Sequence, residues 1–263
     1  MRIPNSPFQF SPNFDAILNV CDARQAWECF LAFNSSGQLP YHNSTHTRFA
    51  VEDAFMLGYR RGGISSWRDL TKLVLASIAH DYNHSGGRTS DAENIQQAIH
   101  AVKQFAKPSL SELTPDDEAQ IVEAVACTEY DLEKGFVMEP TTPIAMALRD
   151  ADLCTMFHVW QEEGLTQVHG LFLEINDRRN LHAEEKVTWG GFLLQQAQFL
   201  TAAKFYTPTG VELQQKYLTN ALGYAVQCNP PEGEQSFNSS ELTEFYSVLT
   251  NFDKLHILEN TNA

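Results

Sequence analysis

Apolar side chains recur three and four positions apart along most of the chain, which is the repeat of helices that bury one face. The segment 66–84 is an example, because Trp67, Leu70, Val74 and Ile78 follow this spacing. Runs of alternating β-branched residues and Asn-Gly turns, which indicate strands and hairpins, are nearly absent from the sequence. The pattern therefore predicts an all-α protein with roughly nine or ten helices of ordinary globular length.

Polar residues with capping propensity precede several of these repeats and mark the expected helix starts. Capping boxes, in which a Ser pairs with an acidic residue three positions later, are expected at Ser66–Asp69 and Ser90–Glu93. Two further starts have a Thr followed by Pro, at Thr114 and Thr142. The remaining helices are expected at about 14–33, 46–60, 164–180, 185–205, 210–226 and 239–258.

The composition fits one folded domain. The chain has 263 residues, of which 43% are hydrophobic and 19% charged, and this ordinary balance permits a substantial core. No internal repeat, low-complexity tract or linker divides the sequence. We therefore expect a single compact domain over residues 1–263, with the motifs that carry chemistry in about 41–155.

The charge balance limits the classes of partner. Eighteen Lys and Arg stand against 33 Asp and Glu, which gives a formal charge of −15. Such an acidic surface argues against a nucleic-acid groove and against binding to an anionic membrane. It also repels phosphate, so a phosphate-containing substrate requires a local positive centre, most simply a metal ion.

Cysteine usage and hydropathy indicate a cytoplasmic protein. The five cysteines are odd in number and form no CxxC pair, so a disulfide scaffold or zinc ribbon is not expected and a reducing compartment is. The first residues, MRIPNSPFQF, lack the apolar core of a secretion signal, and no run of about 18 apolar residues predicts a membrane span.

Four short stretches collect the residues able to bind a metal, namely YHNSTH (41–46), AHDYNHSGG (79–87), SDAEN (90–94) and RDADLC (149–154). The adjacent pair His80–Asp81 is the most informative of them, because an imidazole nitrogen and a carboxylate oxygen there can bind one divalent cation. His46 and Asp152 would complete a His₂Asp₂ set. Mixed nitrogen and oxygen ligands suit zinc, iron, manganese or nickel better than calcium.

The same residues allow a hydrolytic mechanism. Asp81 could bridge to a second cation that is otherwise surrounded by water, as magnesium or manganese prefers. A hydroxide held between two cations is a strong nucleophile at neutral pH, and a nearby histidine could protonate the leaving oxygen. His42 is the candidate for that proton donor. Asp150 and Asp152 are two positions apart on a helix, so their side chains point about 200° apart and only one of them can face the metals.

This order of motifs resembles the HD-domain metal-dependent phosphohydrolases and, more narrowly, the catalytic domain of class I cyclic-nucleotide phosphodiesterases. The resemblance rests on Tyr41-His42-Asn43-Ser44-Thr45-His46, His80-Asp81-Tyr82-Asn83-His84-Ser85-Gly86, Glu93-Asn94, Thr128-Glu129 and Ala151-Asp152-Leu153, and it covers about 41–155. It implies an all-α HD-type bundle.

The resemblance also implies a role for each matching residue. The expected ligands of the tighter ion, zinc or else iron or manganese, are His46, His80, Asp81 and Asp152. Asp81 would bridge to a second ion, magnesium or manganese. His42 would be the general acid, His84 and Glu93 would lie in the network of the second ion's waters, and Thr128 would lie on the pocket wall.

Three positions depart from the family pattern. Asn83 replaces an aspartate, and Glu129 follows Thr128 where the family has Asp. The family binds its purine with a glutamine three residues before a stacking phenylalanine. Aligning TWGGF with that segment puts Phe192 at the stacking position but Trp189 at the glutamine, and an indole has one donor and no acceptor. Three glutamines follow within two turns and offer substitutes: Gln195, Gln196 and Gln198.

Several of these residues have a structural reading beside the functional one. Glu93 is also the third residue of the Ser90 capping box, and His84 could cap the preceding helix end. Trp189 and Phe192 are at helical spacing and suit a buried core. Two arginines, Arg178 and Arg179, could contact phosphate, although a solvated helix end is their simpler role.

The sequence therefore predicts a metal-dependent hydrolase of a phosphodiester, a cyclic nucleotide or a similar small phosphoester. The alternatives are a phosphomonoesterase or nucleotidase of the HD superfamily, an HD-type di-iron oxygenase, and a binding protein with an inactive site. The expected partner is a small-molecule phosphoester, with no nucleic acid and no membrane, and a homo-oligomer is left open.

Overall fold

The computed structural model describes residues 13–60, 63–109, 113–231, 234 and 237–261. In these ranges the helices are α1 Phe14–Val20, α2 Arg24–Phe33, α3 Ser44–Arg60, α4 Trp67–Ala79, α5 Asp91–Ser109, α6 Pro115–Ala126, α7 Pro143–Asp152, α8 Glu162–Leu181, α9 Trp189–Ala202, α10 Pro208–Gln227 and α11 Ser239–Thr261. Short 3₁₀ helices cover Ser35–Gln38 and Leu153–His158. The predicted all-α bundle is confirmed.

The helix starts predicted at Ser66, Thr114 and Thr142 are present in the structure. Thr114 and Asp117 form a reciprocal capping box at the start of α6, with Pro115 in the first turn. Ser66 caps α4 by accepting a hydrogen bond from the amide of Asp69, and Thr142 caps α7 in the same way. These short-range hydrogen bonds satisfy amides that the helix leaves unpaired at its first turn.

Two local features differ from the expected pattern. The helix expected over 14–33 is broken into α1 and α2, because Asp22 takes a left-handed conformation with φ of 49°. A small antiparallel hairpin also forms, in which β1 (Tyr130–Asp131) pairs with β2 (Gly135–Phe136). Its turn is stabilised by the Asp131 carboxylate, which accepts hydrogen bonds from the amides of Glu133 and Lys134.

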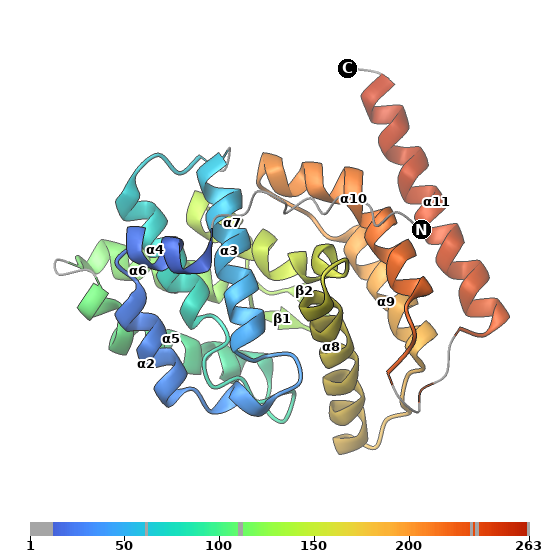
Figure 1. The fold of residues 1–263 in the computed structure, drawn as a ribbon, viewed down its shortest axis with the longest axis horizontal. Helices are drawn as coiled ribbons and strands as arrows, with labels where there is room; N and C mark the ends of the chain where they lie inside the picture. The colour runs from blue at the N-terminus through green and yellow to red at the C-terminus, as the bar shows by residue number, and fades with distance from the viewer. Residues whose placement is uncertain (1–12, 61–62, 110–112, 232–233, 235–236, 262–263) are drawn as a thin grey trace.

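Helices α3, α4 and α7 pack against one another at the centre of the N-terminal half, with α2, α5 and α6 around them (Figure 1). The C-terminal helices α8 to α11 lie on the other side of α3, and α11 packs on α9 at the edge of the molecule (Figure 1). One continuous hydrophobic core runs through both halves, from Ile17 in α1 to Phe252 in α11. No helix of the described residues is both long and apolar enough to cross a membrane.

The packing of the three central helices brings together residues that are distant in the chain. His46 is in the first turn of α3, His80 directly follows α4, and Asp152 is the last residue of α7. Apolar positions fix these helices, since Leu57, Leu73 and Leu148 are fully buried between them. The ends of these helices therefore meet at one place.

Candidate metal centre and substrate cavity

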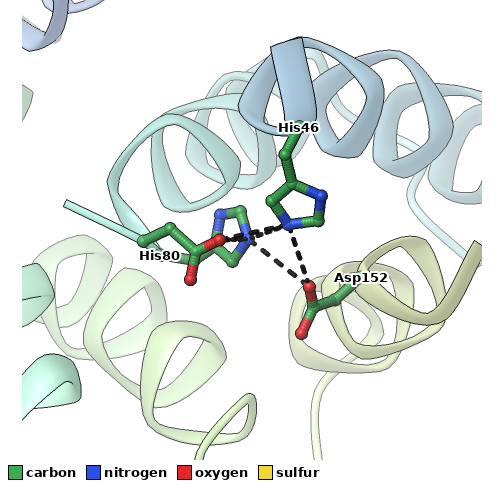
Figure 2. Close-up of side chains that lie close together, drawn as sticks. His46, His80 and Asp152 are labelled. Carbon is green, nitrogen blue, oxygen red and sulfur yellow. Dashed lines mark hydrogen bonds and ion pairs between the residues drawn. The ribbon is translucent and has the colours of Figure 1, made fainter. Parts of the chain in front are cut away.

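Four side chains meet where α3, α4 and α7 converge. The Nε2 atoms of His46 and His80 each lie 3.1 Å from Oδ2 of Asp81. They lie 3.4 and 3.5 Å, respectively, from Oδ1 of Asp152, and 3.4 Å from each other. Figure 2 shows the rings of His46 and His80 and the carboxylate of Asp152 pointing into one space. These four residues form a group able to hold a metal ion.

The spacing of these atoms fits a cation at their centre. Imidazole nitrogen and carboxylate oxygen bind zinc at about 2.0–2.2 Å, so neighbouring ligands in a tetrahedral or octahedral shell lie about 2.8–3.6 Å apart. The five separations above are all within this range.

The protonation of His80 gives a second indication of a cation. Its Nδ1 lies 2.8 Å from the carbonyl oxygen of Ser77, which can only accept, so Nδ1 carries the proton. In the neutral ring the Nε2 lone pair therefore faces the carboxylate of Asp81. That carboxylate's buried Oδ2 receives no well-directed hydrogen bond from any described residue. Lone pairs turned towards one another in a buried place require a positive charge between them, which either a metal ion or a proton on Nε2 supplies.

The electrostatics of the four residues agree with this requirement. Burial alone would lower the pKa of His80 and His46, but the carboxylates of Asp81 and Asp152 outweigh burial and raise both values. Burial opposes ionisation of the two carboxylates, yet the histidines hold the pKa of each below its ordinary value. The site therefore favours two ionised carboxylates, which attract a cation.

Asp150 is separated from this group. Its carboxylate accepts hydrogen bonds from the amides of Tyr206 and Thr207 and from the Thr207 hydroxyl. It thus fixes the start of α10, and burial raises its pKa to about 6. The structure places Asp152 at the centre and Asp150 on the opposite side of α7, as the helix geometry predicts.

His42 lies beside the centre and is held by a residue that the sequence did not suggest. It is in the turn that precedes α3, and its Nδ1 lies 2.6 Å from Oε2 of Glu174 in α8. The other oxygen of Glu174 accepts the backbone amides of Tyr41 and His42. Burial alone would raise the pKa of Glu174, but His42 and these amides hold it below its ordinary value. Glu174 therefore keeps the proton of a neutral His42 on Nδ1 and leaves Nε2 free.

His84 stacks on His42, with ring centroids 3.5 Å apart. Its Nδ1 accepts the backbone amide of Gly86, so the proton of the neutral ring is on Nε2. Burial, reinforced by the neighbouring His42, lowers its pKa and favours this neutral form. Nε2 lies 3.7 Å from the carboxylate of Asp91. His84 therefore presents an N–H donor rather than a metal-binding lone pair.

A cavity of about 1060 Å³ opens from the metal centre towards α8 and α9. His42, His84, Asp81 and Asp152 line its inner end. Its walls come from the loop 86–90, the start of α5, the β1 turn, and the cavity-facing sides of α8 and α9. A space of this size suits a small molecule.

Two more predicted residues lie on the cavity wall. Thr128 is 7% exposed and its hydroxyl donates to the carbonyl of Val125. Glu93 is exposed at the start of α5, where its carboxylate accepts the amide and hydroxyl of Ser90 while Ser90 caps its amide. Both readings of Glu93 are therefore compatible with its position, since the same residue caps the helix and lines the cavity.

Trp189 and Phe192, the expected substrate-binding pair, are placed differently. They are 1% and 0% exposed, stack with ring centroids 5.4 Å apart, and pack with Phe172 in the core. Neither residue lines the cavity. Their location is a correction to the alignment that put them there, and its physical cause is the apolar face of α9, which is buried against α8 at these positions.

Gln196 and Phe199, two turns further along α9, do line the cavity. They have the same three-residue spacing that the phosphodiesterase family uses for its glutamine and phenylalanine. Phe199 makes edge contacts with Tyr130, at 5.4 Å between ring centroids. The Gln196 amide forms no hydrogen bond with the described residues, so it is available to a ligand. A search for Gln-x-x-Phe would have found this pair in the sequence.

Asn83, one of the departures, is turned away from the centre. It is left-handed, with φ of 56°, a conformation that Asn tolerates better than most residues. Its side-chain oxygen accepts the amide and hydroxyl of Ser35. At this position the amide side chain thus joins the loop after α4 to the segment after α2.

No family model matches the chain, and no curated protein is significantly similar to it in sequence. Among solved structures, the chain is similar to LmjPDEB1, a Leishmania phosphodiesterase, in complex with IBMX. The two share 10% identity and a TM-score of 0.45, over 100% of this chain and 92% of that one. At this level of similarity, a functional conclusion has to come from the side chains of the site itself.

Proposed function

We propose that this protein is a metal-dependent hydrolase that cleaves a phosphodiester of a nucleotide or a similar small molecule. The observation that carries the proposal is the grouping of His46, His80, Asp81 and Asp152 at ligand spacing, with the His42–Glu174 pair directly beside it. The four residues would hold the tighter ion. A divalent cation bound there would supply a reactive water and neutralise charge on the phosphoryl group.

His42 would supply the proton that the leaving oxygen needs. Its Nδ1 hydrogen bond to Glu174 fixes the ring, and the negative carboxylate stabilises the protonated imidazole. Nε2 of the protonated ring is then the donor. The stacked ring of His84 limits rotation of His42, and its own Nε2–H can donate to a phosphoryl oxygen or to water.

A second ion would depend mainly on Asp81. The three residues His42, Asp81 and His84 also lie within ligand distance of one another. The two imidazoles have other partners, however. Nδ1 of His42 is hydrogen-bonded to Glu174, and Nδ1 of His84 accepts the amide of Gly86. A second cation would therefore take a carboxylate oxygen of Asp81 and otherwise be surrounded by water, as magnesium and manganese prefer.

The cavity wall suits a planar base. The ring of Phe199 offers a stacking surface, and the Gln196 amide carries both donors and an acceptor for the edge of a base. This pair removes the main objection to a nucleotide substrate that Trp189 raised. A cyclic nucleotide is the first substrate to test.

Metal analysis of the purified protein, followed by a substrate panel with added Mn²⁺ or Mg²⁺, tests the proposal. We expect bound transition metal and hydrolysis of bis(p-nitrophenyl) phosphate and of cyclic nucleotides. His42→Ala should abolish hydrolysis of cyclic nucleotides, whose leaving alkoxide needs a proton, and retain the metal, whereas His100→Ala, an exposed histidine on α5, should change neither. Activity on p-nitrophenyl phosphate alone would indicate a phosphomonoesterase instead.

An iron content with a visible absorption band would favour the oxygenase alternative. That chemistry needs further imidazole ligands at the second iron, and His84 is poorly suited to be one because its Nδ1 accepts the amide of Gly86. Full activity in His42→Ala would show that His42 is not the proton donor.

A further inference from the structure

The last turn of α8 brings two arginines to the cavity. Arg178 and Arg179 line it together with His182, and Glu174 lies one turn earlier on the same helix face as Arg178. Because Glu174 holds His42, Arg178 is one helical turn away from the residue that orients the proposed proton donor. Arginines at a helix end that is only solvated have no need to line a cavity, yet Arg178 and Arg179 both line this one.

Arg178 is held in place by the loop that follows His84. A Cβ added at Gly87, which has φ of 83°, would lie 2.8 Å from both Cγ and Cδ of Arg178. The aliphatic part of Arg178 therefore lies flat on the backbone of Gly87, and the side chain is half-buried. At the neighbouring Gly86, an added Cβ would lie 2.8 Å from Cδ2 of Leu39 and 3.6 Å from Oε2 of Glu174.

Within the described residues, the guanidinium of Arg178 has no hydrogen bond or ion pair. The carboxylate one turn earlier on the helix, that of Glu174, is already used by His42 and two backbone amides. Arg88, across the loop, pairs with Asp177 at 3.5 Å. In a chain with 33 acidic and 18 basic residues, an ordered arginine without a carboxylate partner stands out.

Arg179 adds a second incompletely used donor group. Its Nη1 donates to the carbonyl of Glu185 at 3.1 Å and lies 3.8 Å from the carboxylate of Glu184. Its Nε is buried and has no hydrogen-bond partner. A buried, unpaired guanidinium nitrogen is costly, and an anion in the cavity would satisfy it.

A favourable interaction with the helix dipole explains basic residues in the last turn of α8 but not this arrangement. An arginine placed only for the dipole could extend into water, whereas Arg178 is packed on Gly87 beside the cavity. Most of the acidic residues that line the cavity come from the metal centre, α5 and the β1 turn, and Glu174 is the acidic residue that α8 contributes to the lining.

We propose that Arg178, assisted by Arg179, binds a second anionic phosphate of the substrate, distinct from the phosphodiester at the metal centre. The inference rests on the proposed function and narrows its substrate class to nucleotides that carry an additional phosphate. The cavity of about 1060 Å³ has room for such a molecule. The planar fork of an arginine suits the bidentate recognition of phosphate.

The linear dinucleotides ApA and pApA test this directly, because they share one phosphodiester and differ only in a terminal phosphate. With Mn²⁺ present, we expect kcat/KM for pApA to exceed that for ApA by about tenfold or more. Arg178→Gln should remove most of this preference, chiefly by raising the KM for pApA. Arg178→Lys should keep part of the preference for pApA. Arg24→Gln, on α2 and outside the residues that line the cavity, should keep the whole preference.

A binding measurement distinguishes failure of this inference from failure of the proposed function. If the wild-type protein hydrolyses neither dinucleotide nor bis(p-nitrophenyl) phosphate, the proposed function fails, and calorimetric titration with ApA and pApA still tests Arg178. Tighter binding of pApA that Arg178→Gln abolishes supports the second phosphate site. Equal kcat/KM and equal affinity for ApA and pApA would overturn the inference. So would a preference for pApA that survives both Arg178→Gln and Arg179→Gln in folded protein.

Discussion

Glu174 and His42 are 132 positions apart in the chain, yet Nδ1 of His42 lies 2.6 Å from a carboxylate oxygen of Glu174. The same side chain accepts the backbone amides of Tyr41 and His42. Glu174 thus fixes the turn that carries His42 as well as the imidazole itself. It joins the C-terminal half of the molecule to the proposed chemistry in the N-terminal half.

Glu174→Gln should lower kcat for phosphodiester hydrolysis by about 10- to 100-fold, because a neutral amide stabilises the protonated imidazole less than a carboxylate does. KM should change little, since the substitution leaves the metal ligands in place. Steady-state kinetics with a cyclic nucleotide, whose leaving alkoxide needs a proton, gives both values.

Glu162→Gln, at the exposed start of the same helix, is the matched control for this substitution. It should leave kcat and KM unchanged. A Glu174→Gln enzyme with wild-type kcat would mean that the carboxylate only holds the turn and does not act on the imidazole.

Asp150 and Asp152 provide a comparison within one helix. Asp152→Asn should lower metal content and reduce turnover by roughly 100-fold or more, because an amide is a poor ligand in place of a carboxylate. Asp150→Asn should keep the metal but weaken the hydrogen bonds at the start of α10, at a cost of about 1–3 kcal/mol in unfolding free energy.

Metal analysis and thermal melting of the two variants separate these effects. We expect low metal in Asp152→Asn and a reduced melting temperature in Asp150→Asn. The reverse pattern, with metal lost from Asp150→Asn alone, would contradict the assignment of the ligands.

The glutamine and phenylalanine of α9 make separate contributions to substrate binding. Phe199→Ala should raise KM for a cyclic nucleotide by about tenfold, through the loss of stacking on the base. Gln196→Ala should act in the same direction by leaving the base edge unpaired. Neither variant should alter hydrolysis of bis(p-nitrophenyl) phosphate to the same extent, because that molecule has no base edge to recognise.

Gln198→Ala is the control, since Gln198 points away from the cavity and donates to Glu244 of α11. Its KM for a cyclic nucleotide should match that of the wild type. An unchanged KM in both Phe199→Ala and Gln196→Ala would show that the base does not bind at this wall.

Local signals in the sequence were sufficient for much of the fold. The Thr114 cap of α6 and the apolar repeat of α4 depend on neighbours three or four residues away, and both formed as expected. The break at Asp22 was not foreseen, because a single left-handed residue leaves the helical repeat on either side intact. The hairpin was also missed, since its pairing involves only two residues on each strand.

The candidate site was predictable only in part. Motif order identified His46, His80, Asp81 and Asp152, and the structure brings these four together. Glu174 carries no local signal, because its partner His42 lies in another helical layer and only the packing of α8 joins them.

The substrate pair shows a different limit of sequence reasoning. A shift of seven residues, from Trp189 and Phe192 to Gln196 and Phe199, keeps nearly the same helix face and moves about 10 Å along the axis. Periodicity therefore cannot choose between the two pairs. Only the packing of α9 shows that the first is in the core and the second is at the cavity.

Glu52 makes the stability of the fold depend on pH. Burial raises its pKa from 4.5 to about 7, against the attraction of Arg48. Between these values the folded protein binds a proton at Glu52 that the unfolded chain has released, so the unfolding free energy falls as the pH rises through this window. Below pH 4.5 both states are protonated and the residue contributes no slope.

Glu52→Gln should remove this dependence, because the amide is neutral at every pH. At pH 8 the variant should be more stable than the wild type by on the order of 1–2 kcal/mol, after allowance for the partial exposure of the side chain. Urea unfolding at several pH values between 4.5 and 8 measures the difference, and Glu28→Gln on the exposed face of α2 is the control. Parallel stability curves for Glu52→Gln and the wild type across this range would show that Glu52 titrates as an ordinary surface carboxylate.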